Sequence, residues 1–87
     1  MNEKYINIFL YWFLGKKKMP DDFEEQFLES LDLHYTSEEK TGIINSLKWA
    51  QKNKELDFNT MLPEIEISND EIRQRLSSII DQLGDRD

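Results

Sequence analysis

Apolar residues recur three or four positions apart along most of this chain, which is the spacing of one face of an α-helix. The clearest stripe lies near the C-terminus, after Ser68 and Glu71, whose spacing is that of a capping box. Its members are Ile72, Leu76, Ile79, Ile80 and Leu83. We therefore predict a helix that begins at Ser68 and ends at Gly84, because glycine favours the residue after a helix end.

Three earlier stretches also predict helices. The first runs from about Glu3 to Leu14, is apolar on almost every side, and is followed by Gly15, which suits a left-handed helix end. The second begins at Pro20, a residue favoured in the first helical turn. The third follows a capping signal in Thr36 or Ser37, with Glu39 three residues after Thr36. The inward stripes of the second and third helices are Phe23, Phe27, Leu28 and Leu31, and Ile43, Leu47 and Ala50.

The segment from Leu56 to Ile67 contains Pro63 and cannot be one continuous helix, because proline lacks the backbone N–H that a helix interior needs. We predict an extended crossover there. The expected fold class is all-α: a four-helix antiparallel bundle with an extended crossover between its third and fourth helices. The whole chain, residues 1–87, is expected to form one helical-bundle domain. Each helix is too short to be stable alone, so packing of the stripes must hold the fold.

The overall charge narrows the class of partner. The chain of 87 residues has a formal net charge of -7, and such a chain repels nucleic acid and anionic lipid. It attracts basic protein surfaces instead. The absence of cysteine excludes disulfides and fits a reducing cytoplasm, and the apolar run Tyr5 to Leu14 is roughly half of what spans a bilayer. We expect a cytoplasmic protein that binds a basic protein and binds neither nucleic acid nor membrane directly.

Catalytic and metal-binding patterns are weak. His34 is the single histidine. The polar residues after it, Tyr35, Thr36 and Ser37, fit a turn and a helix cap better than a nucleophile and an orienting group. One histidine without cysteine does not supply the usual zinc ligands. The run Asn69-Asp70-Glu71 does not match the alternating oxygens of a calcium loop. We expect no enzymatic activity, no cofactor and no metal.

Acidic residues concentrate in residues 55–71, a stretch without lysine or arginine. They are Glu55, Asp57, Glu64, Glu66, Asp70 and Glu71. Connections between helices often carry binding residues, although Asp70 and Glu71 also suit the first turn of a helix. We predict that these six residues bind the partner. Tyr35 and Phe58 are candidate aromatic anchors, with core packing as an equal alternative for Phe58.

Two stretches of the chain resemble the colicin D immunity protein family. The first runs from Ile8 to Leu28 and includes Phe13-Leu14-Gly15-Lys16-Lys17 before Phe23-Glu24. The second is Glu66-Ile67-Ser68-Asn69-Asp70-Glu71-Ile72-Arg73. Where the family tends to have acidic residues late in its third helix, this chain has Lys52 and Lys54, so the nearest acids are Glu55 and Asp57.

The resemblance implies a small acidic four-helix protein that neutralises a tRNA-cleaving bacterial toxin, as do related immunity proteins of contact-dependent inhibition systems. The partner would be a basic toxin nuclease domain. Carboxylates would occupy its phosphate-holding cleft and exclude RNA. The residues that would mimic phosphates are Asp57, Glu64, Glu66, Asp70 and Glu71.

Two alternatives remain open. One is a phage-encoded inhibitor that mimics nucleic acid and blocks a defence complex. The other is a helical adaptor that dimerises through the first helix, whereas the immunity interpretation expects a monomer. The side of that helix available for dimerisation would carry Tyr5, Ile8, Tyr11 and Trp12, opposite Ile6, Phe9, Leu10 and Phe13.

Overall fold

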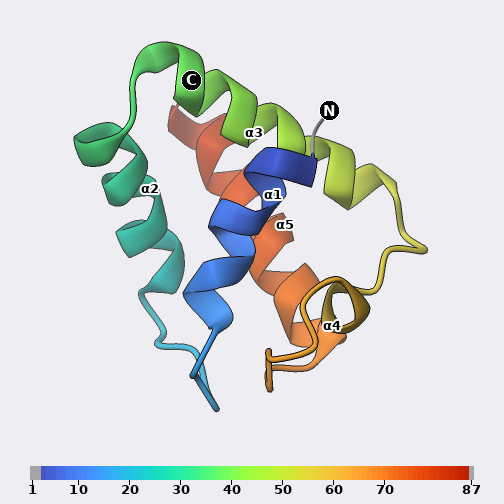
Figure 1. Cartoon of the computed structure of the whole chain (residues 1–87). Helices are drawn as coiled ribbons and strands as arrows, with labels where there is room; N and C mark the ends of the chain where they lie inside the picture. Colours follow the sequence, from blue (N-terminus) through green and yellow to red (C-terminus); the bar gives the residue numbers. More distant parts are fainter. Residues whose placement is uncertain (1–2, 87) are drawn as a thin grey trace.

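The computed structural model describes residues 3–86 of the chain, and every regular element within them is helical (Figure 1). In chain order the elements are α1 (Glu3–Leu10), the 3-10 helix η1 (Tyr11–Phe13), α2 (Phe23–His34), α3 (Ser37–Lys52), α4 (Phe58–Met61) and α5 (Asn69–Arg86). The predicted all-α class is confirmed. The antiparallel four-helix bundle is not, because α3 lies across one end of α1 and α5 rather than alongside them (Figure 1).

The aromatic part of the core forms where α1 and η1 meet α2, and phenylalanine supplies most of it. Phe9 lies with its ring centroid 5.1 Å from Phe13 and 5.7 Å from Phe27, in edge-to-face arrangements that aromatic pairs favour. Trp12 contacts Phe23 and Phe27 from the rim of this cluster. The predicted inward stripes are confirmed, because the members of the α2 and α3 stripes are all buried. On α5, Ile72, Leu76 and Ile79 are buried, and Ile80 and Leu83 pack against the same core.

Two helix starts follow the chemistry of their caps. The Thr36 hydroxyl accepts a hydrogen bond from the Glu39 backbone N–H at 3.1 Å, and the Glu39 carboxylate accepts one from the Thr36 N–H at 2.9 Å. This confirms the predicted capping box of α3. At the start of α5, the Ser68 hydroxyl accepts from the Glu71 N–H at 3.2 Å.

Three predicted helix boundaries are wrong. The first helix changes to a 3-10 turn after Leu10, although Gly15 does adopt the expected left-handed conformation with φ 72°. The second helix begins at Phe23 rather than Pro20, because the intervening residues form a turn in which the Phe23 N–H bonds to the Pro20 carbonyl. The last helix continues through Gly84 to Arg86.

α1 packs most extensively against α3, and a glycine allows the close approach. A Cβ atom added to Gly42 would lie 2.8 Å from the ring of Tyr5, closer than two carbon atoms can approach without a shift. Gly42 therefore sits inside a helix, where its propensity is poor, because the neighbouring aromatic ring occupies the space of a side chain.

An ion pair links α2 to α5. The Arg75 guanidinium donates to both carboxylate oxygens of Glu24, at 3.0 and 3.3 Å, and also to the Met19 carbonyl at 3.4 Å. Glu24 is a buried residue near the N-terminus of α2. The pair thus connects α5 to the loop before α2 as well as to α2 itself.

Candidate functional site

The extended crossover predicted for Leu56 to Ile67 is wrong at Phe58–Met61, which form the one-turn helix α4 within the acidic segment, residues 55–71. Asp57 caps this helix: its carboxylate accepts a hydrogen bond from the Asn59 N–H at 2.9 Å. The Asn69 side-chain oxygen accepts from the Phe58 N–H, also at 2.9 Å. The first N–H groups of a helix have no acceptor within it. These two side chains supply acceptors for the first N–H groups of α4.

Arg73, on α5, attaches the beginning of the segment to the rest of the molecule. Its Nη2 donates to the Asn53 carbonyl at 2.9 Å and to the Leu56 carbonyl at 2.6 Å. Its guanidinium lies 5.0 Å from the ring centroid of Phe58, within the range of a cation–π contact. Arg73 therefore fixes the backbone on both sides of Glu55 through hydrogen bonds to carbonyl groups.

In the second half of the segment, buried and exposed side chains alternate, and the buried ones anchor it to the core. Ile65 and Ile67 are buried, whereas Glu64 and Glu66 are exposed. Asn59 donates from its side-chain nitrogen to the Ile67 carbonyl at 2.8 Å, which links α4 to this stretch. The loop is thus anchored by apolar residues while its glutamates face outward.

The six predicted partner-binding carboxylates differ little in exposure. Glu55, Asp57, Glu64, Glu66 and Asp70 are exposed, and Glu71 is half-buried. None of the six is in an ion pair with a side chain that the structure describes, those of residues 5–84. Asp57 is the one whose carboxylate also has a structural task, the cap of α4. The structure leaves these charges available to a partner.

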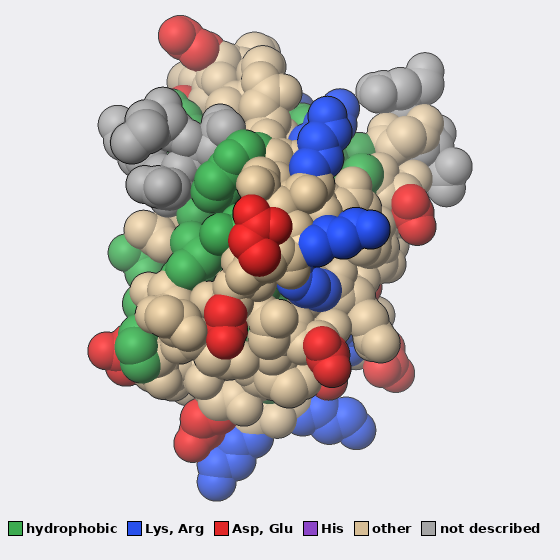
Figure 2. Space-filling view, turned by 90° about the vertical axis from the view of Figure 1, so that its right-hand side faces the viewer, with side chains coloured by type: hydrophobic (Ala, Val, Ile, Leu, Met, Phe, Trp, Pro, Cys, Tyr) green, Lys and Arg blue, Asp and Glu red, His purple; other side chains and the backbone are tan. Residues whose placement is uncertain are grey.

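Basic residues adjoin the acidic segment on one side. A hollow of about 600 Å³ between the end of α3 and α5, called here the basic hollow, is lined by Gln51, Lys52, Lys54, Arg73, Leu76 and Ser77. Figure 2, which looks onto the side of the molecule that carries α4, shows lysine and arginine side chains next to carboxylates. The acidic surface is therefore interrupted rather than continuous.

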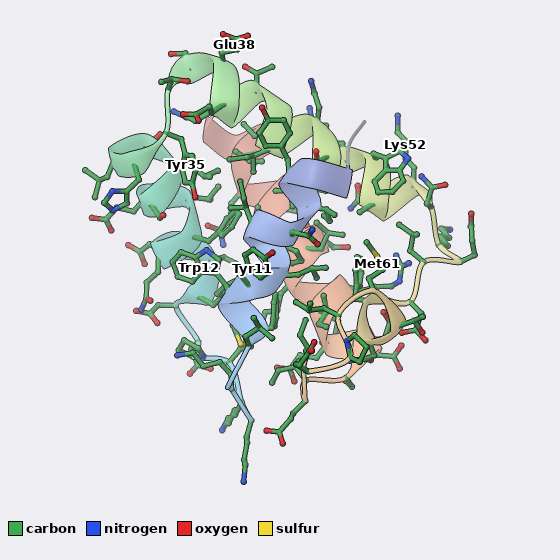
Figure 3. All side chains as sticks on the ribbon, in the orientation of Figure 1. Tyr11, Trp12, Tyr35, Glu38, Lys52 and Met61 are labelled. Atoms are coloured by element: carbon green, nitrogen blue, oxygen red, sulfur yellow. The ribbon has the colours of Figure 1, made fainter. Side chains whose placement is uncertain are left out.

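The two candidate aromatic anchors are not part of one site. Phe58 is fully buried, so it belongs to the core and is not exposed to a partner. Tyr35 is half-buried and lines a second hollow, the aromatic hollow, together with Ile8, Tyr11 and Trp12. Figure 3 places Tyr35 and Trp12 on one side of α1 and Met61, from α4, on the other. Tyr35 is thus separated from the acidic segment.

A third hollow lies beside the acidic segment and was not predicted from the sequence. This apolar hollow, of about 340 Å³, is lined by Asn7, Trp49, Leu56 and Met61, which come from α1, α3, the following turn and α4. All four residues are half-buried. The signal in the sequence was Leu56, an apolar residue placed between Glu55 and Asp57, but its neighbours in the hollow could not be inferred from local patterns.

The described residues have few features of other kinds of site. His34 is exposed at the end of α2. Among the side chains of residues 5–84, which the structure describes, no group of three or more histidines, aspartates or glutamates lies close enough together to hold a metal ion. No helix of this part of the chain has both the length and the apolar character needed to cross a membrane. Comparison of the chain with models of protein families, with curated proteins and with solved structures finds no match.

Proposed function

We propose that this protein is an immunity protein, which inhibits a bacterial toxin nuclease by covering its basic, RNA-holding cleft with the acidic segment. One observation carries the proposal. Six carboxylates lie in a stretch without lysine or arginine, outside any ion pair with the described side chains of residues 5–84, on a backbone held by Arg73, Asn59 and Asn69.

The chemistry of such a cleft matches this surface. An enzyme that cuts RNA holds phosphates with lysine and arginine side chains, which also attract carboxylates. The net charge of -7 steers the inhibitor toward a basic surface and accelerates the encounter. Because the segment is already anchored, binding does not have to order it, and that lowers the entropic cost of association.

The resemblance to the colicin D immunity proteins supports the same assignment, since its second stretch, residues 66–73, lies at the end of the acidic segment. Lys52 and Lys54 depart from the family pattern and line the basic hollow. We therefore place the toxin contact on Glu55, Glu64 and Glu66 rather than on the last turn of α3.

Charge reversal at two acidic positions tests the proposal. Asp57 is unsuitable because its replacement would also remove the cap of α4. Glu55→Lys with Glu66→Lys changes exposed side chains for which the structure has no hydrogen bond or ion pair. When the protein is co-expressed with the basic domain encoded by the neighbouring reading frame, we expect the wild type to restore growth and this variant to fail.

The matched control reverses two exposed acids elsewhere, Glu29→Lys with Asp81→Lys, with the same change in net charge. We expect this control to protect almost as well as the wild type, and both variants to keep the wild-type circular dichroism. Protection by Glu55→Lys/Glu66→Lys equal to that of the control would overturn the assignment of the site.

A second candidate function is self-association through the aromatic hollow. Tyr11 is 56% exposed there, a large value for an aromatic side chain that adjoins a core. On this alternative the protein would be a helical adaptor that dimerises through α1. Sedimentation over a wide range of concentration tests it: a dimer that Tyr11→Glu converts to a monomer supports the adaptor, and a monomer at every concentration excludes it.

A further inference from the structure

The apolar hollow offers a contact of a different kind from the carboxylates around it. Its lining includes the Trp49 ring and the side chains of Leu56 and Met61, and it opens to solvent. Protein interfaces commonly combine an apolar centre with a polar or charged rim. In Figure 2, hydrophobic side chains lie directly beside carboxylates on this side of the molecule.

Carboxylates flank one of the residues that line the hollow. Leu56 stands between Glu55 and Asp57 in the chain, both exposed, and Met61 precedes the stretch that carries Glu64 and Glu66. Lys52 and Lys54 line the basic hollow, which does not share a residue with the apolar one. An occupant that contacts Leu56 therefore meets the negative charge of Glu55 and Asp57 on that side.

We infer that the apolar hollow receives one aliphatic side chain of a basic partner, with lysine or arginine residues on either side of it that pair with the acids of the segment. The inference rests on the proposed function and adds to it the apolar centre of the contact. Met61 suits this role because methionine is unbranched and adapts to the shape of an occupant. Trp49 supplies the rigid aromatic wall that interface centres favour.

The hollow is large enough to hold one aliphatic side chain. Its volume of about 340 Å³ lies at the low end of the range of small-molecule pockets. Burial of one leucine side chain on binding is worth about tenfold in affinity or more. The apolar contact would thus fix the position of the partner on this surface, whereas attraction between charges drives the encounter.

Two peptides test the inference on the wild-type protein. The first has a leucine between two pairs of lysines, and the second has glycine in place of that leucine. The protein is labelled with ¹³C at the methionine methyl groups, and the Met61 signal is assigned from Met61→Leu. Met19 is 2% exposed and serves as an internal control, since its signal should not move.

We expect the leucine peptide to shift the Met61 signal in a saturable way and the glycine peptide to bind roughly tenfold more weakly. Glu55→Lys/Glu66→Lys should weaken both peptides. Equal binding of the two peptides, or no saturable shift, would overturn the inference, and so would leucine-peptide binding that this variant leaves unchanged.

The outcomes separate the hollow from the proposed function. If the leucine peptide docks but the protein does not protect against the toxin domain, the proposed function fails and the site for a basic, apolar-centred partner remains. If the protein protects but the peptides bind equally, the toxin contact lacks this apolar centre and the inference fails alone.

Discussion

At the scale of single residues, the Glu24–Arg75 pair is the most consequential polar contact of the described chain. The side chains are 9% and 19% exposed, so both charges are largely removed from water. Removal of one partner of such a pair leaves the other charge without compensation, whereas replacement of both by apolar groups is often tolerated. The pair therefore restricts which single substitutions are tolerated at these two positions more than it adds to the stability of the fold.

We expect Arg75→Met to lower the free energy of unfolding by about 3 kcal/mol, because it leaves the Glu24 carboxylate buried and unpaired. The double variant Glu24→Leu/Arg75→Met should recover to within about 1 kcal/mol of the wild type, since neither charge then remains. Urea unfolding followed by circular dichroism measures both. A single variant as stable as the wild type would contradict this description of the pair.

The two helical glycines should respond to alanine with opposite signs. Gly84 has no atom near the position of an added Cβ, so Gly84→Ala should raise stability by up to about 1 kcal/mol. Gly42→Ala must displace the Tyr5 ring, an overpacking that costs about 1–3 kcal/mol and exceeds the gain in helix propensity. Thermal unfolding of the two variants gives the signs.

A double-mutant cycle identifies the cause of the Gly42 effect. In a Tyr5→Ala background the ring is absent, so Gly42→Ala should no longer destabilise the protein. If the loss persists in that background, the contact with Tyr5 is not its origin.

At the scale of elements, α4 and α5 differ in what determines them. α5 has a long apolar stripe and would be expected in almost any all-α arrangement of this chain. α4 has four residues, and its start depends on Asp57 and on Asn69 from another helix. It exists because the Phe58 side chain is buried and the neighbouring backbone groups find partners.

Leu76 tests the packing of α5. It is 1% exposed, and Leu76→Ala should lower the free energy of unfolding by about 2–5 kcal/mol, through lost burial and the cavity left behind. Gln74→Ala, on the exposed side of the same helix, should change it by less than about 0.5 kcal/mol. Equilibrium urea unfolding compares the two. A change of less than about 0.5 kcal/mol for Leu76→Ala would mean that this face of α5 is not packed.

At the scale of the whole molecule, the buried apolar residues form one cluster to which α1, α2, α3, α4 and α5 all contribute. The radius of gyration is 12.2 Å, and a compact chain of this length is expected to have about 12 Å. No subset of helices has a separate core among the described residues. Loss of any one of them exposes part of the same cluster.

We therefore expect two-state unfolding. Trp12 adjoins the aromatic cluster of α1 and α2, and Trp49 lines the apolar hollow beside α4, so fluorescence reports two distant regions. Its transition in urea should coincide with that of circular dichroism, which follows the helices. Separate transitions would show that α4 and its surroundings unfold independently.

The sequence by itself determined α2, α3 and α5 and the sides they bury, because helical periodicity and capping depend on residues a few positions apart. The stripes of α2, α3 and α5 and the Thr36 capping box were predicted for this reason. The clustering of acids in residues 55–71 was equally visible, since it is a property of neighbours in the chain.

Only the tertiary structure decided which of the candidate binding residues are available to a partner. Phe58 is in the core, Tyr35 lies across α1 from the acids, and the apolar hollow joins residues from four parts of the chain. Contacts such as that between Arg75 and Glu24 join residues 51 positions apart. They depend on how the helices pack, and packing is a property of all the stripes together, so no local pattern contains it.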